Sequence, residues 1–63
     1  MVIHDWSCVF KGQSVIVHKR RAFVASGIVD DWMPNGSAVW ILNPKVSRRV
    51  LILREDGMVL SQA

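Results

Sequence analysis

The chain has 63 residues, of which 51% are apolar, and eight lysines and arginines against five aspartates and glutamates give it a formal charge of +3. This length allows one small domain with a single core and excludes a multi-domain enzyme. So short a chain buries only about 60% of its unfolded surface, and it depends on disulfides, a metal or a partner subunit where its core falls short.

Cys8 is the only cysteine, so no disulfide can form within the chain. A single thiol without a recognisable secretory leader favours a cytoplasmic protein. The longest apolar run, Ala38 to Leu42, is far shorter than the roughly 20 residues of a transmembrane helix, and we expect no membrane partner.

Ten valines and five isoleucines, with apolar residues at every second position, predict an all-β chain. Residues 1–11 alternate in this way and predict an N-terminal strand or arm of the single domain 1–63. A turn at Lys11–Ser14 leads to a strand at Val15–Val17. This strand runs into the basic segment His18–Arg21, which is expected to be a loop or a strand end.

The alternation resumes from Ala22 to Met33, and Gly27 in its middle predicts a bulge or a sharp bend. Pro34-Asn35-Gly36 then predicts a hairpin, because proline fixes φ and Asn-Gly accepts positive φ. Trp32 and Trp40 should therefore lie on antiparallel neighbouring strands.

A second hairpin is expected to join Ala38–Leu42 to Arg49–Arg54 through the connection Asn43–Ser47. Glu55-Asp56-Gly57 forms another turn, and Met58–Leu60 closes the chain as a short strand. All connections are short, so we expect a small barrel of five or six short antiparallel strands.

Glycines and valines recur at characteristic positions between Gly12 and Leu60. They are Gly12, Val15, Gly27-Ile28-Val29, Pro34, Gly36, Ala38-Val39, Val50 and Ile52. This layout resembles the Src-homology-3-like (SH3-like) small β-barrels. Within that group it is similar to the type II dihydrofolate reductases, tetramers whose shared pore is lined by a Val-Gln-Ile-Tyr stretch. Val50-Leu51-Ile52-Leu53 lacks those polar residues, so the resemblance implies the fold and no reductase activity.

A second series of signals consists of Gly12-Gln13-Ser14, Asn35-Gly36, Asn43-Pro44-Lys45 and Val50–Glu55. In length and order it resembles the carbon storage regulator family of RNA-binding dimers. The resemblance implies RNA binding, with Arg54 at the place of the family's RNA-contacting arginine.

No constellation of residues indicates catalysis or a bound cofactor. The two histidines have no spacing that pairs a base with a nucleophile. Cys8, His4 and Asp5 supply only three of the four ligands of a structural zinc site, so we expect a small buried thiol and a surface histidine. The adjacent Asp30 and Asp31 would face opposite ways on a strand and are expected to end it before the turn.

Seven of the eight cations cluster at expected turns and strand ends, which suits the phosphates of a polyanion, and the sequence pI is near 9.8. We therefore expect a small nucleic-acid-binding regulatory module, with a base stacked on tryptophan. The candidate contact residues are Lys19, Arg20, Arg21, Trp32, Lys45, Arg48, Arg49 and Arg54. The alternative is a protein-interaction module, or a small regulator that docks on a larger protein through an apolar surface, with charges that serve solubility.

Two expected strands are apolar on both faces, whereas a small barrel has one interior. One apolar set must face outward, and burial against an identical copy would cover it. We therefore expect a symmetric homo-oligomer, a dimer in the simplest case, with Trp40, Leu51 and Leu53 at or near the interface. Trp40 should be buried.

Overall fold

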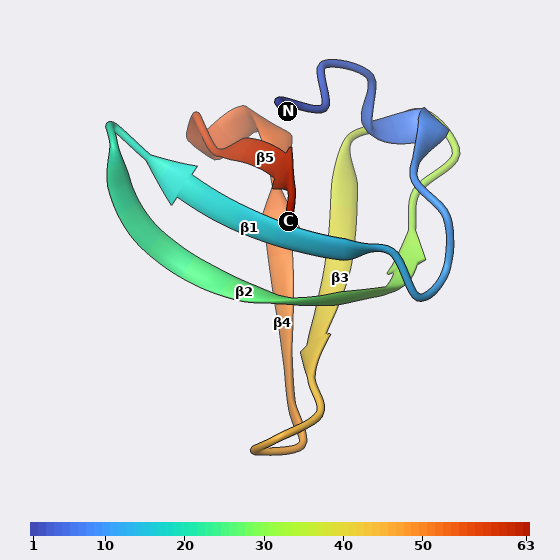
Figure 1. Ribbon diagram of the computed structural model, residues 1–63. Helices are drawn as coiled ribbons and strands as arrows, with labels where there is room; N and C mark the ends of the chain where they lie inside the picture. The colour runs from blue at the N-terminus through green and yellow to red at the C-terminus, as the bar shows by residue number, and fades with distance from the viewer.

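The computed structural model describes residues 1–63 and contains five β-strands and two short 3-10 helices (Figure 1). The strands are β1 (Ser14–Lys19), β2 (Ala22–Trp32), β3 (Ala38–Asn43), β4 (Arg48–Leu53) and β5 (Val59–Gln62). The helices are η1 (Trp6–Cys8) and η2 (Arg54–Asp56). All strands pair antiparallel in one sheet of order β4-β3-β2-β1-β5, which confirms the all-β prediction. Neither 3-10 helix is long and apolar enough to cross a lipid bilayer.

Both predicted hairpins are present. The β2–β3 connection contains Pro34-Asn35-Gly36, with Gly36 at φ +76° and the Asn35 side-chain oxygen accepting from the Ser37 N–H at 3.0 Å. The β3–β4 hairpin keeps one register over all six residue pairs, from Ala38 with Leu53 to Asn43 with Arg48. The turn residues therefore set these connections, as expected from their backbone preferences.

β2 is long and curved, and it belongs to both halves of the sheet (Figure 1). Its residues up to Ile28 pair with β1, and those from Ile28 onward pair with β3. A Cβ at Gly27 would lie 2.4 Å from the Leu42 carbonyl oxygen, so only glycine allows the two backbones to approach this closely. The strand pairing is also irregular on either side of Gly27, because Val24 has no partner residue on β1 and Asp30 has none on β3.

The sheet is not closed into a barrel, and the expectation of closure is wrong. β4 pairs only with β3, and β5 pairs with β1 but not with β4. Instead, the outer edge of β5 is covered by the N-terminal segment: the Ile3 N–H donates to the Leu60 oxygen at 2.7 Å, and the Gln62 N–H donates to the Met1 oxygen at 2.8 Å. Because residues 1–3 occupy that edge, β4 cannot pair there.

Residues 1–11 do not form the expected strand. Val2 makes an isolated bridge to Ser61, and the chain then turns into η1, with the Asp5 side chain accepting from the Ser7 N–H at its start. Trp6 and Val9 point inward, and their spacing of three residues is that of a 3-10 turn. The alternation of apolar residues, which predicts a strand, is therefore misleading in this segment. Since Cys8 lies at the end of η1 on the outside, its thiol is exposed rather than buried.

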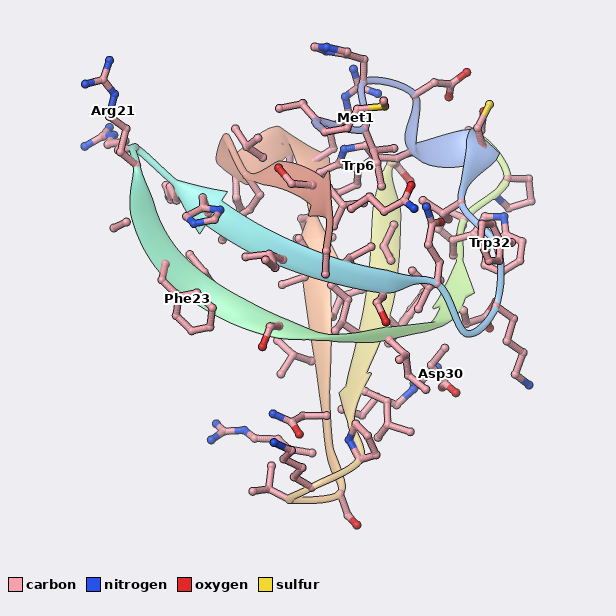
Figure 2. All side chains as sticks on the ribbon, in the orientation of Figure 1. Met1, Trp6, Arg21, Phe23, Asp30 and Trp32 are labelled. Atoms are coloured by element: carbon pink, nitrogen blue, oxygen red, sulfur yellow. The ribbon has the colours of Figure 1, made fainter.

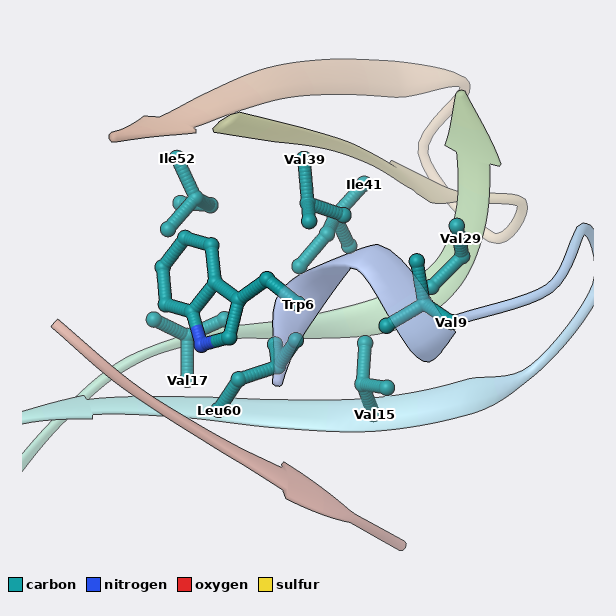
Figure 3. Close-up of a cluster of buried hydrophobic side chains, with 9 residues drawn as sticks. All are labelled: Trp6, Val9, Val15, Val17, Val29, Val39, Ile41, Ile52 and Leu60. Carbon is teal, nitrogen blue, oxygen red and sulfur yellow. The ribbon is translucent and has the colours of Figure 1, made fainter. Parts of the chain in front are cut away.

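The core lies between the two halves of the bent sheet, with the Trp6 indole at its centre (Figure 3). Its side chains are mainly β-branched, as the composition predicts, and all are nearly inaccessible to solvent. They are Trp6, Val9, Val15, Val17, Val29, Val39, Ile41, Ile52 and Leu60. The N-terminal segment is thus a structural part of the domain, because it supplies the only large aromatic ring of this cluster.

Candidate nucleic-acid interface

Two hairpin tips carry five exposed or half-buried cations. The β1–β2 tip contains Lys19, Arg20 and Arg21, and the β3–β4 tip contains Lys45 and Arg48. Both tips border the same side of the sheet, because two adjacent hollows are each lined by residues of both hairpins. The hollows therefore lie between the two hairpins that carry these basic clusters, with Arg48 lining the first hollow and Lys45 the second.

Arg20 and Arg21 form the entire connection between Lys19 and Ala22. Their φ angles are +51° and +67°, the pattern of a two-residue type I′ turn. This turn fits the right-handed twist of the strands, but its positive φ angles suit Asn-Gly far better than arginine. A left-handed conformation costs a residue with a Cβ about 1–2 kcal/mol. Here two arginines occupy those positions.

The β3–β4 tip is shaped by its own side chains. Asn43 accepts from the Lys45 N–H through its side-chain oxygen at 3.0 Å, and its carbonyl accepts from the Val46 N–H at 3.3 Å. Ser47 completes the turn at φ +51°. This arrangement presents Val46, 65% exposed, and Arg48 next to the first hollow.

The first hollow, of about 410 Å³, has an apolar floor and lies between the two tips. Its lining residues are Phe23, Val24, Ala25, Ser26, Ile41, Asn43, Val46, Arg48 and Val50. Phe23 also lines the second hollow, together with His18 and Lys45. Its ring is 65% exposed and meets the His18 ring edge-on, with 6.2 Å between centroids.

Phe23 was not among the residues singled out from the sequence. A signal existed: a two-residue turn at Arg20-Arg21 places Phe23 beside His18, a polar residue that a strand turns to solvent. The irregularity at Val24 then shifts the faces of β2, so the simple alternation hides this exposure. Figure 2 shows Phe23 and Arg21 toward one end of β2, with Asp30 and Trp32 toward the other.

Acidic side chains are absent from this part of the surface. No aspartate or glutamate lines either hollow. The acidic residues lie elsewhere, at Asp5 before η1, at Asp30 and Asp31 in β2, and at Glu55 and Asp56 in η2. The only salt bridge joins Asp30 to Arg49, so the five cations of the two tips have no acidic partner.

Asp30 and Asp31 do not end β2, which continues to Trp32, and the expectation of an ending there is wrong. Asp30 sits at the irregularity of the β2–β3 ladder, where its carboxylate accepts from the Arg49 Nε at 2.7 Å. Asp31 accepts from the Trp32 N–H at 2.8 Å. Both carboxylates thus have local structural roles and strand pairing continues around them.

Three predicted contact residues lie away from the hollows. Arg49 is on β4, bound to Asp30, with its guanidinium carbon 5.3 Å from the Trp40 ring centroid. Trp32 is half-buried and packs against the core. Arg54 opens η2 and is exposed. Of the eight predicted residues, only Lys45 and Arg48 line the hollows, and Lys19, Arg20 and Arg21 form the β1–β2 tip without lining them.

Arg54 is close enough to influence Asp5. The pKa of the Asp5 carboxyl lies below its ordinary value, chiefly because the Ser7 hydroxyl and the Ser7 N–H donate to it. The Cys8 thiol, 3.4 Å away, contributes next, and the charge of Arg54 contributes least. No group of three or more histidine, cysteine, aspartate or glutamate side chains is arranged to hold a metal ion.

The predicted interface residues lie on the outer face of β3 and β4. Trp40 is paired with Leu51, and Leu53 with Ala38. Trp40 is half-buried beneath Arg49, so the expectation that it is buried is wrong: its strand neighbours Val39 and Ile41 take the inward positions. Leu51 is 47% exposed.

No protein-family model, curated protein or solved structure matches the chain.

Proposed function

We propose that the chain is a small nucleic-acid-binding regulatory domain. The two basic hairpin tips contact backbone phosphates, and the hollow between them receives a base. The ligand is single-stranded, because only an unpaired base can leave its stack and lie against Phe23. No reaction is proposed.

The conformation of Arg20 and Arg21 is the observation that carries this proposal. Asn-Gly would adopt these two positive φ angles at a lower cost in conformational free energy, so the turn carries its two charges at the expense of its own stability. Strain of this kind concentrates at functional sites. Arginine's planar guanidinium pairs with phosphate through two parallel hydrogen bonds, which a solubilising charge does not require.

The hollow supports the single-stranded form of the ligand. An exposed phenylalanine with aliphatic neighbours offers a face for stacking, and Arg48 in the same lining can pair with a phosphate of the stacked nucleotide. We assign the stacking role to Phe23 rather than to Trp32, because Trp32 packs partly against the core.

The test is binding of single- and double-stranded RNA and DNA oligonucleotides over a range of salt concentrations. For the wild type, log affinity should fall linearly with log salt, by about 0.7 for each phosphate contact on a single strand. The double variant Arg20→Asn/Arg21→Gly should lower the magnitude of this slope by about 1.4. The same variant should raise the free energy of unfolding by about 1 kcal/mol, because Asn-Gly relieves the strained turn.

Matched variants locate the binding surface. Lys11→Gln removes one charge from the turn before β1, which belongs to neither basic hairpin tip, and should change affinity much less than Arg20→Gln. Arg54→Gln tests the resemblance to the carbon storage regulators: a dominant loss there, with little loss at Arg20, would move the site to the end of β4. Absence of any retardation at low salt by all four nucleic acids would refute the proposal.

The alternative function is docking on a larger protein, which the exposed Phe23, Val24 and Val46 would also permit. A pull-down from lysate, with and without nuclease treatment, separates the two. Partners that disappear with nuclease support nucleic-acid binding, whereas partners that persist support a protein-interaction module. The lone free Cys8 is compatible with the reducing cytoplasm, where we place the protein.

Two further features of the proposal concern fold and assembly. The strand order, with a 3-10 turn before the last strand, supports an SH3-like relationship in an open form. The apolar outer face at Trp40, Leu51 and Leu53 supports self-association into a homodimer.

A further inference from the structure

The outer edge of β4 is left without a backbone partner along the whole strand. In an antiparallel ladder, every second residue of a strand directs its N–H and C=O groups toward the neighbouring strand. The Arg54 N–H donates to the Ser37 oxygen at 2.9 Å, so Arg54 is one of the residues that face β3 in this way. Arg49, Leu51 and Leu53 therefore direct their N–H and C=O groups away from β3. None of the backbone hydrogen bonds outside the strand ladders involves these three residues.

We propose that a second copy of the chain pairs with this edge, β4 against β4 in antiparallel orientation, to form a ten-stranded sheet. This inference refines the self-association proposed above and is independent of nucleic-acid binding. It places Leu51 of one copy beside Leu53 of the other, with the two-fold axis at Ile52.

Charge makes the strand complementary to itself. Arg48 and Arg49 begin β4, whereas Glu55 and Asp56 follow its end in η2. In an antiparallel pair, the basic start of each strand lies next to the acidic residues that follow the other. A parallel pair would instead bring like charges together.

Most features that protect an edge strand are missing from β4. Such strands commonly carry charged residues, proline or a bulge, and the only charged residues of β4, Arg48 and Arg49, stand at its start. β4 reads Arg-Arg-Val-Leu-Ile-Leu and keeps an unbroken register with β3, so its outer edge is regular and able to pair. Its exposed Leu51 lies on the same outer face as Trp40, and pairing would extend this apolar surface across both copies.

The assembly stops at two copies because the other edge of each sheet is covered. Residues 1–3 already bond to β5, so neither end strand of the ten-stranded sheet is left bare. A closed two-fold dimer follows, rather than an open filament.

The experiment is light scattering coupled to size exclusion at tens of micromolar protein without nucleic acid. The wild type should elute with twice the chain mass of 7.1 kDa. Leu51→Pro removes an edge N–H that β3 does not use and should give a folded monomer, because proline is tolerated at such edge positions. Leu51→Ala keeps the N–H and should only weaken the dimer.

Charge reversal provides a second route that does not depend on proline being accommodated. Arg48→Glu should shift the protein toward the monomer, and adding Asp56→Arg should restore the dimer, since the two positions meet only across the pair. Circular dichroism confirms folding of each variant. A wild-type monomer, a Leu51→Pro dimer, or failure of Asp56→Arg to restore the assembled mass would each overturn the proposal.

Discussion

The two outer edges of the sheet are treated in opposite ways. At the β5 edge, Ile3 and Gln62 contribute hydrogen bonds between the strand and the N-terminal segment. At the β4 edge, the outward backbone groups of Arg49, Leu51 and Leu53 have no such cover. The chain thus protects one edge by itself and leaves the β4 edge bare, and the bare edge is the one that we propose for association.

The difference also shows what covering an edge requires. Residues 1–3 are too few to hold their place through hydrogen bonds alone, because each contributes only about 1 kcal/mol net. Trp6, three residues after Ile3, is buried in the core and fixes the segment (Figure 3). The covered edge thus depends on a side-chain anchor, and removing that anchor should make the two edges alike.

The largest effect is expected for Trp6→Ala. Loss of the indole from the core should cost about 3–5 kcal/mol, which is comparable to the whole stability of so short a domain. The variant should be largely unfolded at 25 °C, as measured by circular dichroism and thermal melting. Phe10→Ala is the control, because Phe10 is an exposed aromatic in the same segment and its loss should change the free energy of unfolding by at most about 0.5 kcal/mol. Equal melting of Trp6→Ala and wild type would contradict the anchor role.

A smaller effect is expected for Ile3→Pro, which removes the N–H bonded to Leu60 at 2.7 Å. Compared with Ile3→Ala, it should lose about a further 1 kcal/mol in urea denaturation. It should also form species larger than a dimer, because the β5 edge becomes bare. Val2→Pro is the control, since the Val2 N–H makes no bond to β5. If both proline variants behave alike, the hydrogen bond does not protect the edge.

The smallest effect concerns acid stability. Hydrogen bonds from Ser7 lower the pKa of Asp5 in the folded state. The carboxylate therefore stabilises the fold at pH values above its pKa in the unfolded chain, and this stabilisation is lost as the pH falls through its pKa in the folded state. The melting temperature of the wild type should therefore drop below about pH 4. Asp5→Asn keeps an acceptor at the start of η1, and its melting temperature should fall less steeply with decreasing pH. If the melting temperatures of the variant and the wild type depend on pH identically, Asp5 is excluded as a source of the acid sensitivity.

Local patterns in the sequence were sufficient for the hairpins and for much of the candidate site. Turn residues such as Pro34-Asn35-Gly36 act through their own backbone preferences, and the basic turn at Arg20-Arg21 is visible by composition. The N-terminal segment could not be predicted in this way. Its alternation is that of a strand, but tertiary burial of Trp6 and Val9 selects a 3-10 turn instead.

Phe23 and the open sheet escaped prediction for a related reason. The exposure of Phe23 depends on the irregular pairing around Val24, which no local pattern specifies. Closure of the sheet depends on which segment pairs with the β5 edge, and residues 1–3 occupy that edge. Both outcomes are set by contacts between segments distant in the chain.

The shared strand β2 has a consequence for how the domain opens. Because Gly27 lets one continuous strand serve both halves of the sheet, neither half can detach without breaking the ladder of the other. Slow amide protons of β1 and of β3 should therefore exchange with deuterium through the same global opening event and yield the same opening free energy. Fluctuations confined to one half would be limited to the hairpin tips, so the basic turns can adapt to a ligand while the core remains a single cooperative unit.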